Sequence, residues 1–193
     1  MSFWKIAAVS REAGIERRPV RTAVGAALLL ALTLIAYIPA LRGGFIWDDD
    51  FLVTKNPNIL TFEGLVRTWT DPRANKDFYP LTHTFFWLEH RFRGFDPFVF
   101  HLNNVLLHAG NGILFWLILR RLAVPGAWAA AAIFLVHPLH VESVAWISER
   151  KNVLSGFLCL LAVRSFLGSA PAGAGTPLVC RWYSTSQPSW PSP

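Results

Sequence analysis

Apolar residues fall into four long runs along the chain, and most of the charged residues lie between these runs. The first run, residues 22–41, contains no charged side chain. A helix of about 20 residues is long enough to cross the ~30 Å hydrocarbon core of a bilayer. The second run extends from about 98 to 122 and finishes in Arg120 and Arg121. This pattern predicts two membrane-spanning helices.

The third and fourth apolar runs are shorter. Residues 127–136 are apolar throughout, but a helix of that length reaches only about 15 Å. The helix must therefore continue through His137-Pro138 toward Ile147 or break at that point. A fourth run covers 153–163 and is followed by Arg164. Together the runs predict an all-α protein, a multi-spanning transmembrane helix bundle of three to four spans.

Residues 43–97 separate the first two runs and predict an extracytoplasmic loop with a helix of its own. Gly43-Gly44 ends the first helix, and Thr61 is a candidate N-cap for the next. Apolar residues then recur at the i, i+3, i+4, i+7 spacing of a short amphipathic helix, namely Phe62, Leu65, Val66 and Trp69. Asp71-Pro72 ends this helix. We expect it to lie on the membrane surface.

The basic residues indicate the orientation of the chain in the membrane. They gather in residues 1–21, ahead of the first span, and again at Arg120-Arg121. Because cytoplasmic segments carry an excess of Lys and Arg, both clusters predict that residues 1–21 are cytoplasmic and that residues 43–97 lie outside. The first apolar run is longer than the apolar region of a signal peptide, so we expect it to be an uncleaved helix.

Composition excludes several other classes of protein. The chain is 53% hydrophobic and 14% aromatic, which is richer in apolar residues than a soluble domain of this size usually is. Its net charge is +6, but the basic residues form no stripe interleaved with aromatics, so we expect no nucleic-acid partner. Cys159 and Cys180 give neither metal-ligand spacing nor a disulfide framework. Residues 168–193 are rich in Gly, Ser and Pro and predict a disordered tail.

Two polar sets accompany the first two spans. Asp48-Asp49-Asp50 follows the first span directly. Adjacent carboxylates at a membrane surface can hold a divalent cation, or one of them can act as a base; an acidic loop without a chemical role is the alternative. The second set shares one helical face of the second span, and for it we favour interhelical hydrogen bonding: His101, Asn104, His108 and Asn111.

Residues 137–152 place a third polar set against the apolar runs. Ionisable groups beside hydrocarbon are costly, so they normally face a protein interior or a wet cavity and serve a function. Arg150 and Lys151 lie on the predicted outer side, against the positive-inside tendency. An anionic ligand, such as the phosphate of a lipid-linked donor, stabilises such a pair. Pairing with Glu142 or Glu149 is the structural alternative, and the sequence leaves both open.

The order of these motifs resembles that of a known family. The acidic residues are followed by Tyr79-Pro80-Leu81-Thr82 and by the segments 85–89, 101–108 and 137–155. Over residues 20–165 the chain resembles the N-terminal membrane region of bacterial tetratricopeptide-repeat membrane proteins. These proteins are similar to the eukaryotic transmembrane-and-TPR O-mannosyltransferases, which are GT-C type glycosyltransferases. The resemblance implies a partial GT-C-like domain over 22–167, in an integral protein of a bacterial inner membrane with a cytoplasmic N-terminus.

The resemblance also implies a reaction and its residues. The enzyme would take a sugar from a polyprenyl-phosphate donor in the membrane lipid and transfer it to protein Ser/Thr or to another acceptor, such as a glycan. Asp48 and Asp49 correspond to the catalytic centre and are candidate ligands of a divalent metal ion, while Asp50 is matched less securely. The cavity that binds substrate would be lined by His137, His140 and Glu142. Arg150 and Lys151 are assigned to the donor phosphate, on their charge more than on the resemblance.

The chain also departs from this family. Its members continue through further spans and usually a TPR array, whereas the similarity here fades after Val163. We therefore expect a truncated chain that is inactive by itself. The alternative from a different class is a non-catalytic membrane anchor or scaffold, in which the Asp and His motifs are packing groups.

Overall fold

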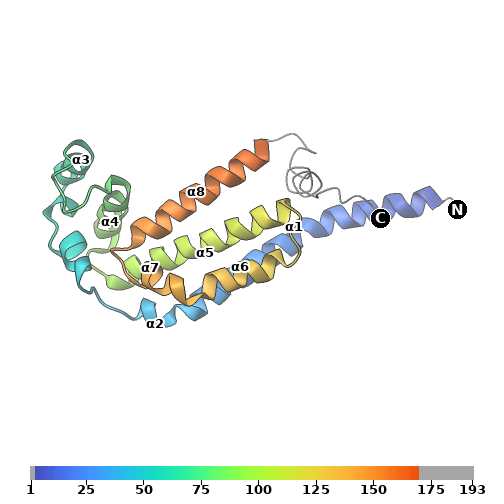
Figure 1. The fold of residues 1–193 in the computed structure, drawn as a ribbon, viewed down its shortest axis with the longest axis horizontal. Helices are drawn as coiled ribbons and strands as arrows, with labels where there is room; N and C mark the ends of the chain where they lie inside the picture. The colour runs from blue at the N-terminus through green and yellow to red at the C-terminus, as the bar shows by residue number, and fades with distance from the viewer. Residues whose placement is uncertain (1–2, 170–193) are drawn as a thin grey trace, which may run out of the picture.

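The described residues form a bundle of helices. The computed structural model describes residues 3–169, with side chains from Val20 onward. This part of the chain holds helices and loops but no strand, which confirms the all-α prediction. The long helices are α1 (Phe3–Ala36), α5 (Pro97–Arg121), α6 (Ala127–Val136) and α8 (Arg150–Ser169). They run alongside one another, and α5 packs against the other three (Figure 1).

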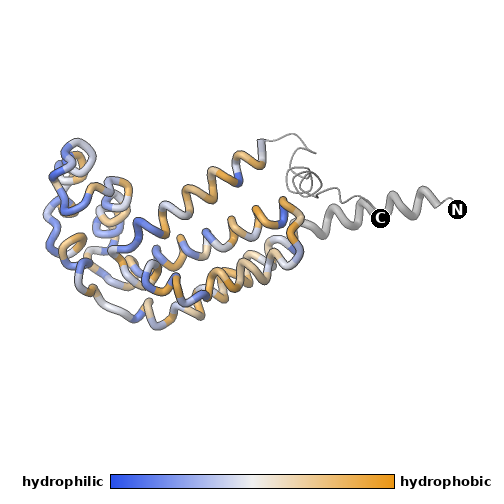
Figure 2. Tube along the Cα trace, viewed as in Figure 1, coloured by the Kyte–Doolittle hydropathy of each residue, from blue (hydrophilic) through white to orange (hydrophobic). Residues whose placement is uncertain are grey.

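Short helices gather at one end of this bundle, which we call the loop end and which comprises residues 43–96 and 137–149 (Figure 1). The tube in Figure 2 shows more hydrophilic residues at the loop end than along α5 and α6. Short α2 (Ile38–Leu41) leads into it from α1. The loop end holds a π-helical turn η1 (Asp50–Thr54), a 3-10 turn η2 (Pro57–Ile59), α3 (Phe62–Thr70), α4 (Pro80–Arg93), a second 3-10 turn η3 (Pro138–His140) and α7 (Val141–Ala145).

The second apolar run forms the central helix of the bundle, α5, which confirms the helix expected over about 98–122. Asp96 caps its start by accepting a hydrogen bond from the Phe98 backbone N–H at 3.1 Å. Two glycines allow its neighbours to approach closely, because a Cβ at Gly25 of α1 would overlap the Trp116 ring and one at Gly112 would overlap Leu135 of α6.

The first apolar run is not one continuous helix. Within the residues whose side chains are described, the apolar part of α1 is Val20–Ala36, and helix resumes only after Tyr37, in α2. Pro39 accounts for the interruption, because it has no N–H to donate to a carbonyl of the preceding turn.

The third run breaks at His137. α6 ends at Val136, His137 is extended (φ −68°, ψ 131°), and Pro138 opens η3. A proline disfavours helical geometry in the residue before it, so the break resolves the alternative that the sequence left open. The pair Ala127–Val136 and Pro138–Ala145 is bent by 51°.

Within the described residues, two helices are long and apolar enough to cross a membrane, Pro97–Arg121 and Arg150–Ser169, or up to three if the bent pair is one span. This compares with the three to four spans expected. α8 begins at Arg150 and continues through Gly168 and Ser169, so the tail expected from 168 begins inside a helix. The remainder of that tail, residues 170–193, lies outside the described residues.

Helix α3 forms as its apolar spacing predicts. The Thr61 side chain accepts a hydrogen bond from the Gly64 backbone N–H at 3.0 Å, and Asp71 closes the helix. Its buried residues, however, are Gly64 and Thr68, not the apolar ones. Gly64 lies against the backbone of Asn58, where a Cβ would overlap. The apolar face, with Phe62, Val66 and Trp69, is therefore exposed, and its contact with a membrane surface stays a prediction.

A separate hydrophobic core holds the loop end together. Its buried residues come from η1, η2, α4, α5 and the segment before α8: Leu52, Val53, Ile59, Phe86, Phe100 and Ile147. Complete burial of one such side chain contributes about 1.5–3 kcal/mol. The segments 43–60 and 141–149 are thus fixed against the same end of the bundle.

Candidate active site at the loop end

Asp49 joins two segments that are far apart in the sequence. Its side chain is completely buried. Oδ2 accepts a hydrogen bond from the Ile46 backbone N–H at 3.1 Å, and Oδ1 accepts one from the Ser148 backbone N–H at 2.7 Å. Hydrogen bonds to a charged acceptor are stronger than neutral ones, so Asp49 ties the acidic turn after the first helix to the segment just before α8.

The two neighbouring aspartates are exposed and have other partners. Asp48 lies 3.1 Å from Lys76 Nζ, and Asp50 lies 3.0 Å from Lys55 Nζ. The hydrogen bonds from Lys55 and Thr54 lower the pKa of Asp50. Each aspartate of the predicted motif therefore has its own environment, and Asp48 and Asp50 remain accessible from outside the protein.

The predicted metal site finds little support in this arrangement. Both oxygens of Asp49 already accept backbone N–H groups, and Oδ1 of Asp48 already pairs with Lys76. No group of three or more His, Cys, Asp or Glu side chains that could hold a metal ion occurs among residues whose side chains are described. The donor set does not fit a metal centre.

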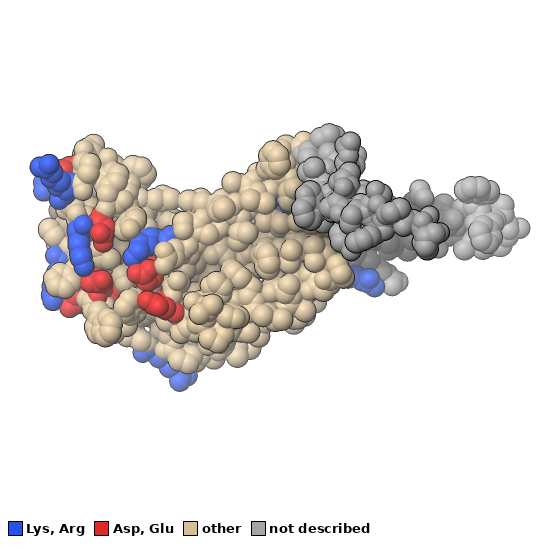
Figure 3. Space-filling view, in the orientation of Figure 1, with Lys and Arg blue, Asp and Glu red and all other residues tan. Residues whose placement is uncertain are grey.

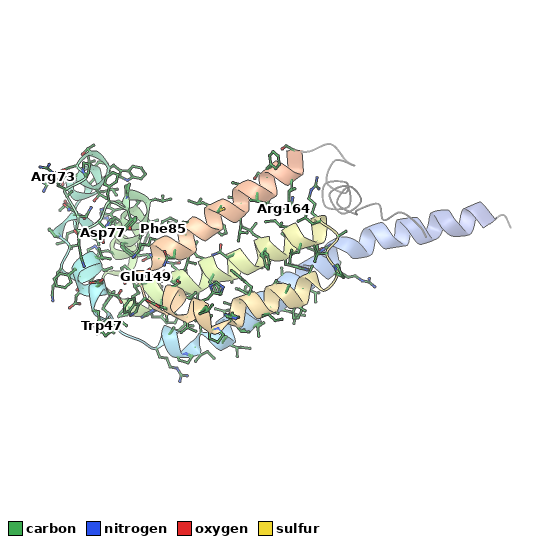
Figure 4. All side chains as sticks on the ribbon, in the orientation of Figure 1. Trp47, Arg73, Asp77, Phe85, Glu149 and Arg164 are labelled. Carbon is green, nitrogen blue, oxygen red and sulfur yellow. The ribbon has the colours of Figure 1, made fainter. Side chains whose placement is uncertain are left out.

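Trp47 lies beside the acidic turn in an uncommon conformation. Its backbone has φ 47°, in the left-handed region, which costs roughly 1–2 kcal/mol for a residue with a Cβ. The indole is 78% exposed, and its ring centroid lies 5.3 Å from that of Trp146. Figure 4 shows Trp47 and Glu149 at the loop end and Arg164 far along α8. The aromatic contact is a second link between the acidic turn and the segment before α8.

Arg150 is completely buried, and each of its three guanidinium nitrogens donates a hydrogen bond to a protein group. Its Nη1 pairs with Glu89 of α4, its Nε donates to Asn104 Oδ1 at 2.6 Å, and its Nη2 donates to the Phe100 carbonyl at 2.7 Å. The guanidinium carbon also lies 4.6 Å from the centroid of the Phe86 ring.

The structural alternative, pairing of the two cations with Glu142 or Glu149, holds for Lys151, which pairs with Glu149, but is wrong for Arg150. The partner is Glu89, because the N-terminus of α8 packs against α4 and α5. Glu89 also accepts a hydrogen bond from Asn103 Nδ2 at 2.6 Å. Burial raises the pKa of the Glu89 carboxyl, and Arg150 and Asn103 act in the opposite direction.

Lys151, next along the chain, faces a groove. Its Nζ lies 2.8 Å from Glu149 and 5.6 Å from the centroid of the Tyr79 ring. The groove has a volume of about 390 Å³ and lies between the residues that begin α4, 78–82, and one side of α8, where Leu154 and Leu158 line it. It therefore combines a largely apolar wall with one cation, Lys151. Figure 3 shows acidic and basic side chains together at the loop end.

The remaining predicted site residues lie apart from this groove. His140 lines a second cavity of about 330 Å³ between α5, α6 and α8, together with His108 and Asn111. The rings of His137 and His140 lie 6.3 Å apart. His137 and Glu142 are exposed, so the structure does not bring all five predicted substrate-binding residues into one cavity.

Three of the four polar residues on this face of α5 bond to neighbouring segments, as expected. The Asn104 amide donates to the Val144 and Trp146 carbonyls, His108 Nε2 lies 3.1 Å from the Leu135 carbonyl, and the Asn111 amide donates to the Val153 carbonyl. The interhelical role is confirmed for these three residues. Glu89, in contrast, was missed as a site residue, although it stands within one of the motifs that carry the family resemblance.

Comparison with known proteins finds similarity over most of the chain. Protein O-mannosyl-transferase tmtc2 of Xenopus laevis is 32% identical over 150 residues, which cover 71% of this chain and 18% of that protein. TMTC1 of Mus musculus is 31% identical over 182 residues, which cover 83% of this chain and 19% of the relative. The chain thus spans about a fifth of the length of the curated relatives it matches. No family model matches it, and no solved structure does.

Proposed function

We propose that this chain, which is similar to TMTC protein O-mannosyl-transferases over most of its length, forms part of a membrane glycosyltransferase. The donor is a sugar carried on a polyprenyl phosphate, and the acceptor is a protein Ser or Thr hydroxyl. One observation carries the proposal: buried Asp49 fixes the acidic turn against the segment that leads to Lys151 and the groove. The acidic turn, whose carboxylate can accept a proton, and Lys151, which can bind a phosphate, are thus connected through one segment.

We assign different roles to the two predicted catalytic carboxylates. Asp48 is exposed, so an acceptor hydroxyl can reach it, and it is the candidate base. Asp49 is buried and bonded at both oxygens, so it positions the turn. In the reaction the acceptor oxygen bonds to C1 of the sugar while the bond from C1 to the phosphate oxygen breaks. The polyprenyl phosphate leaves with that electron pair, and the hydroxyl proton passes to Asp48.

The groove beside Lys151 suits the donor. Its apolar wall along α8 can take an isoprenoid chain, and Lys151 lies where the phosphate would sit. A lysine beside the phosphate favours its departure, because it stabilises the negative charge that develops there. Arg150 is completely buried, whereas Lys151 is partly exposed and lines the groove, so Lys151 is the residue of the pair that we assign to the phosphate, in place of its contact with Glu149. His140, with His137 and Glu142 nearby on the same segment, is left for contacts to the sugar or the acceptor.

The orientation expected from the sequence is part of this proposal. With residues 1–21 in the cytoplasm, the loop end lies on the outer face of the membrane. Arg164 lies far along α8 from the loop end (Figure 4) and is then on the cytoplasmic side. The bacterial inner membrane remains the proposed location.

The test uses an isosteric change in the full-length protein, by which we mean this chain together with the further spans that the family resemblance implies. Asp48→Asn in the full-length protein should abolish O-linked sugar on acceptor proteins, measured by mass spectrometry of intact glycopeptides, with the same amount of protein in the membrane. Lys55→Gln, which removes an exposed cation from the same turn, is the matched control and should leave the sugar in place. Normal glycosylation with Asp48→Asn would favour the alternative of a non-catalytic membrane scaffold.

A further inference from the structure

The buried pair Arg150–Glu89 lies next to the segment that connects the two groups proposed to act in the reaction, the acidic turn and Lys151. Arg150 is two residues after Ser148, whose N–H holds Asp49, and directly precedes Lys151 at the groove. The three residues in this short stretch thus face three different sites. The conformation of this stretch therefore sets the separation of the acidic turn from the groove cation.

Every donor nitrogen of Arg150 is used to hold that stretch in place. The guanidinium bonds to a carboxylate on α4, a side-chain amide on α5 and a backbone carbonyl on α5. Asn104 completes the arrangement, because it accepts from Arg150 and donates to the Trp146 carbonyl at 2.8 Å. The stretch 146–150 is therefore bonded at both of its ends to the same residue of α5.

A buried ion pair is a weak source of stability by itself, since desolvation of both charges offsets most of their attraction. An apolar pair of similar volume would fill the same space without that cost. The planar guanidinium of an arginine does fix the relative orientation of the groups it binds, because its N–H donors meet several acceptors at set angles. The pair is therefore better explained by a role in holding the segment 146–150 in position than by a contribution to stability.

We propose that Arg150 and Glu89 are positioning residues for the transfer reaction, which set the acidic turn and Lys151 at the separation that the donor requires. This inference rests on the proposed function and adds to it two residues that touch neither donor nor acceptor. Misplacement of reacting groups by about 1 Å can cost 10²-fold in rate, so loss of the pair should lower kcat for sugar transfer by at least about tenfold.

The decisive variant replaces the pair by apolar residues, Glu89→Leu/Arg150→Met, in the full-length protein. Folded protein is measured by thermal unfolding in detergent, and transfer is measured with polyprenyl-phosphate mannose as the donor probe. A positioning role predicts near-normal unfolding with kcat lowered at least about tenfold. A purely structural role predicts that the variant which regains stability also regains normal kcat, and that result would overturn the inference.

Two milder variants keep the test decisive if the double variant does not fold. Arg150→Lys keeps the charge but loses the fork, and Glu89→Gln keeps the shape but loses the charge; each should lower kcat per folded molecule, and normal kcat in either overturns the inference. Lys55→Gln serves as the control. Asp48→Asn separates the two proposals. Sugar transfer that survives Asp48→Asn refutes the proposed function. Loss of transfer in Asp48→Asn, together with normal kcat in the Arg150 and Glu89 variants, refutes only the positioning role.

Discussion

Removal of Glu89 alone should destabilise the loop end strongly. In Glu89→Leu, Arg150 stays completely buried but loses its counter-charge, and Asn103 loses an acceptor. Breaking a buried pair by removing one partner costs about 3–5 kcal/mol. Arg150 keeps its bonds to Asn104 and the Phe100 carbonyl, so we expect the lower part of that range, about 3 kcal/mol. Small proteins have only about 5–15 kcal/mol in total.

Thermal unfolding of detergent-solubilised protein measures this effect. Glu89→Leu should unfold well below the unmodified protein, and adding Arg150→Met should recover most of the loss, because an apolar pair of similar volume is often neutral or better. Lys55→Gln, at an exposed pair, should unfold as the unmodified protein does. Unchanged stability of Glu89→Leu, or a double variant no more stable than the single one, would show that the unpaired Arg150 charge does not destabilise the protein.

Three further predictions follow from named contacts. Lys151→Met should raise the KM for polyprenyl-phosphate mannose at least about tenfold, since a hydrogen bond to a charged group contributes about 1.5–3 kcal/mol, and an unchanged KM would remove Lys151 from the donor site. Gly64→Ala should release α3 from Asn58 and speed limited proteolysis at Arg73, whereas Gly44→Ala, with open space around it, should not; equal proteolysis rates would contradict the packing. Burial lowers the pKa of His83, so the unfolded state binds the proton more tightly, and stability should fall as pH falls below about 6.5; in His83→Leu this loss should shrink, and an unchanged pH dependence would exclude His83 as its source.

Local features of the fold could be predicted well from the sequence. The hydropathy and the terminal arginines predicted α5 to within a residue or so at each end, and Thr61 with its apolar spacing predicted α3. Each of these depends on residues close together in the chain. The interruption at Tyr37 was not predicted, although Pro39 was the local signal for it.

The contacts that build the candidate site could not be predicted in the same way. Asp49 meets Ser148 across 99 residues, and Arg150 meets Glu89 across 61. Nothing in the periodicity of either segment specifies such a pairing, and Glu142 and Glu149 were nearer candidates in the sequence. Burial also separated residues that look equivalent: Asp48 and Asp49 are adjacent and chemically identical, yet one is exposed and the other is enclosed.

The most direct test of the proposed function is transfer by the purified protein. Full-length protein is incubated in detergent with polyprenyl-phosphate mannose, carrying label in the sugar, and with a Ser/Thr-containing acceptor protein. The account predicts that labelled mannose appears in O-linkage on the acceptor, that polyprenyl phosphate is released in equal amount, and that both are lost in Asp48→Asn. Release and transfer that persist in Asp48→Asn, or no transfer by the unmodified protein with the donor intact, would contradict it.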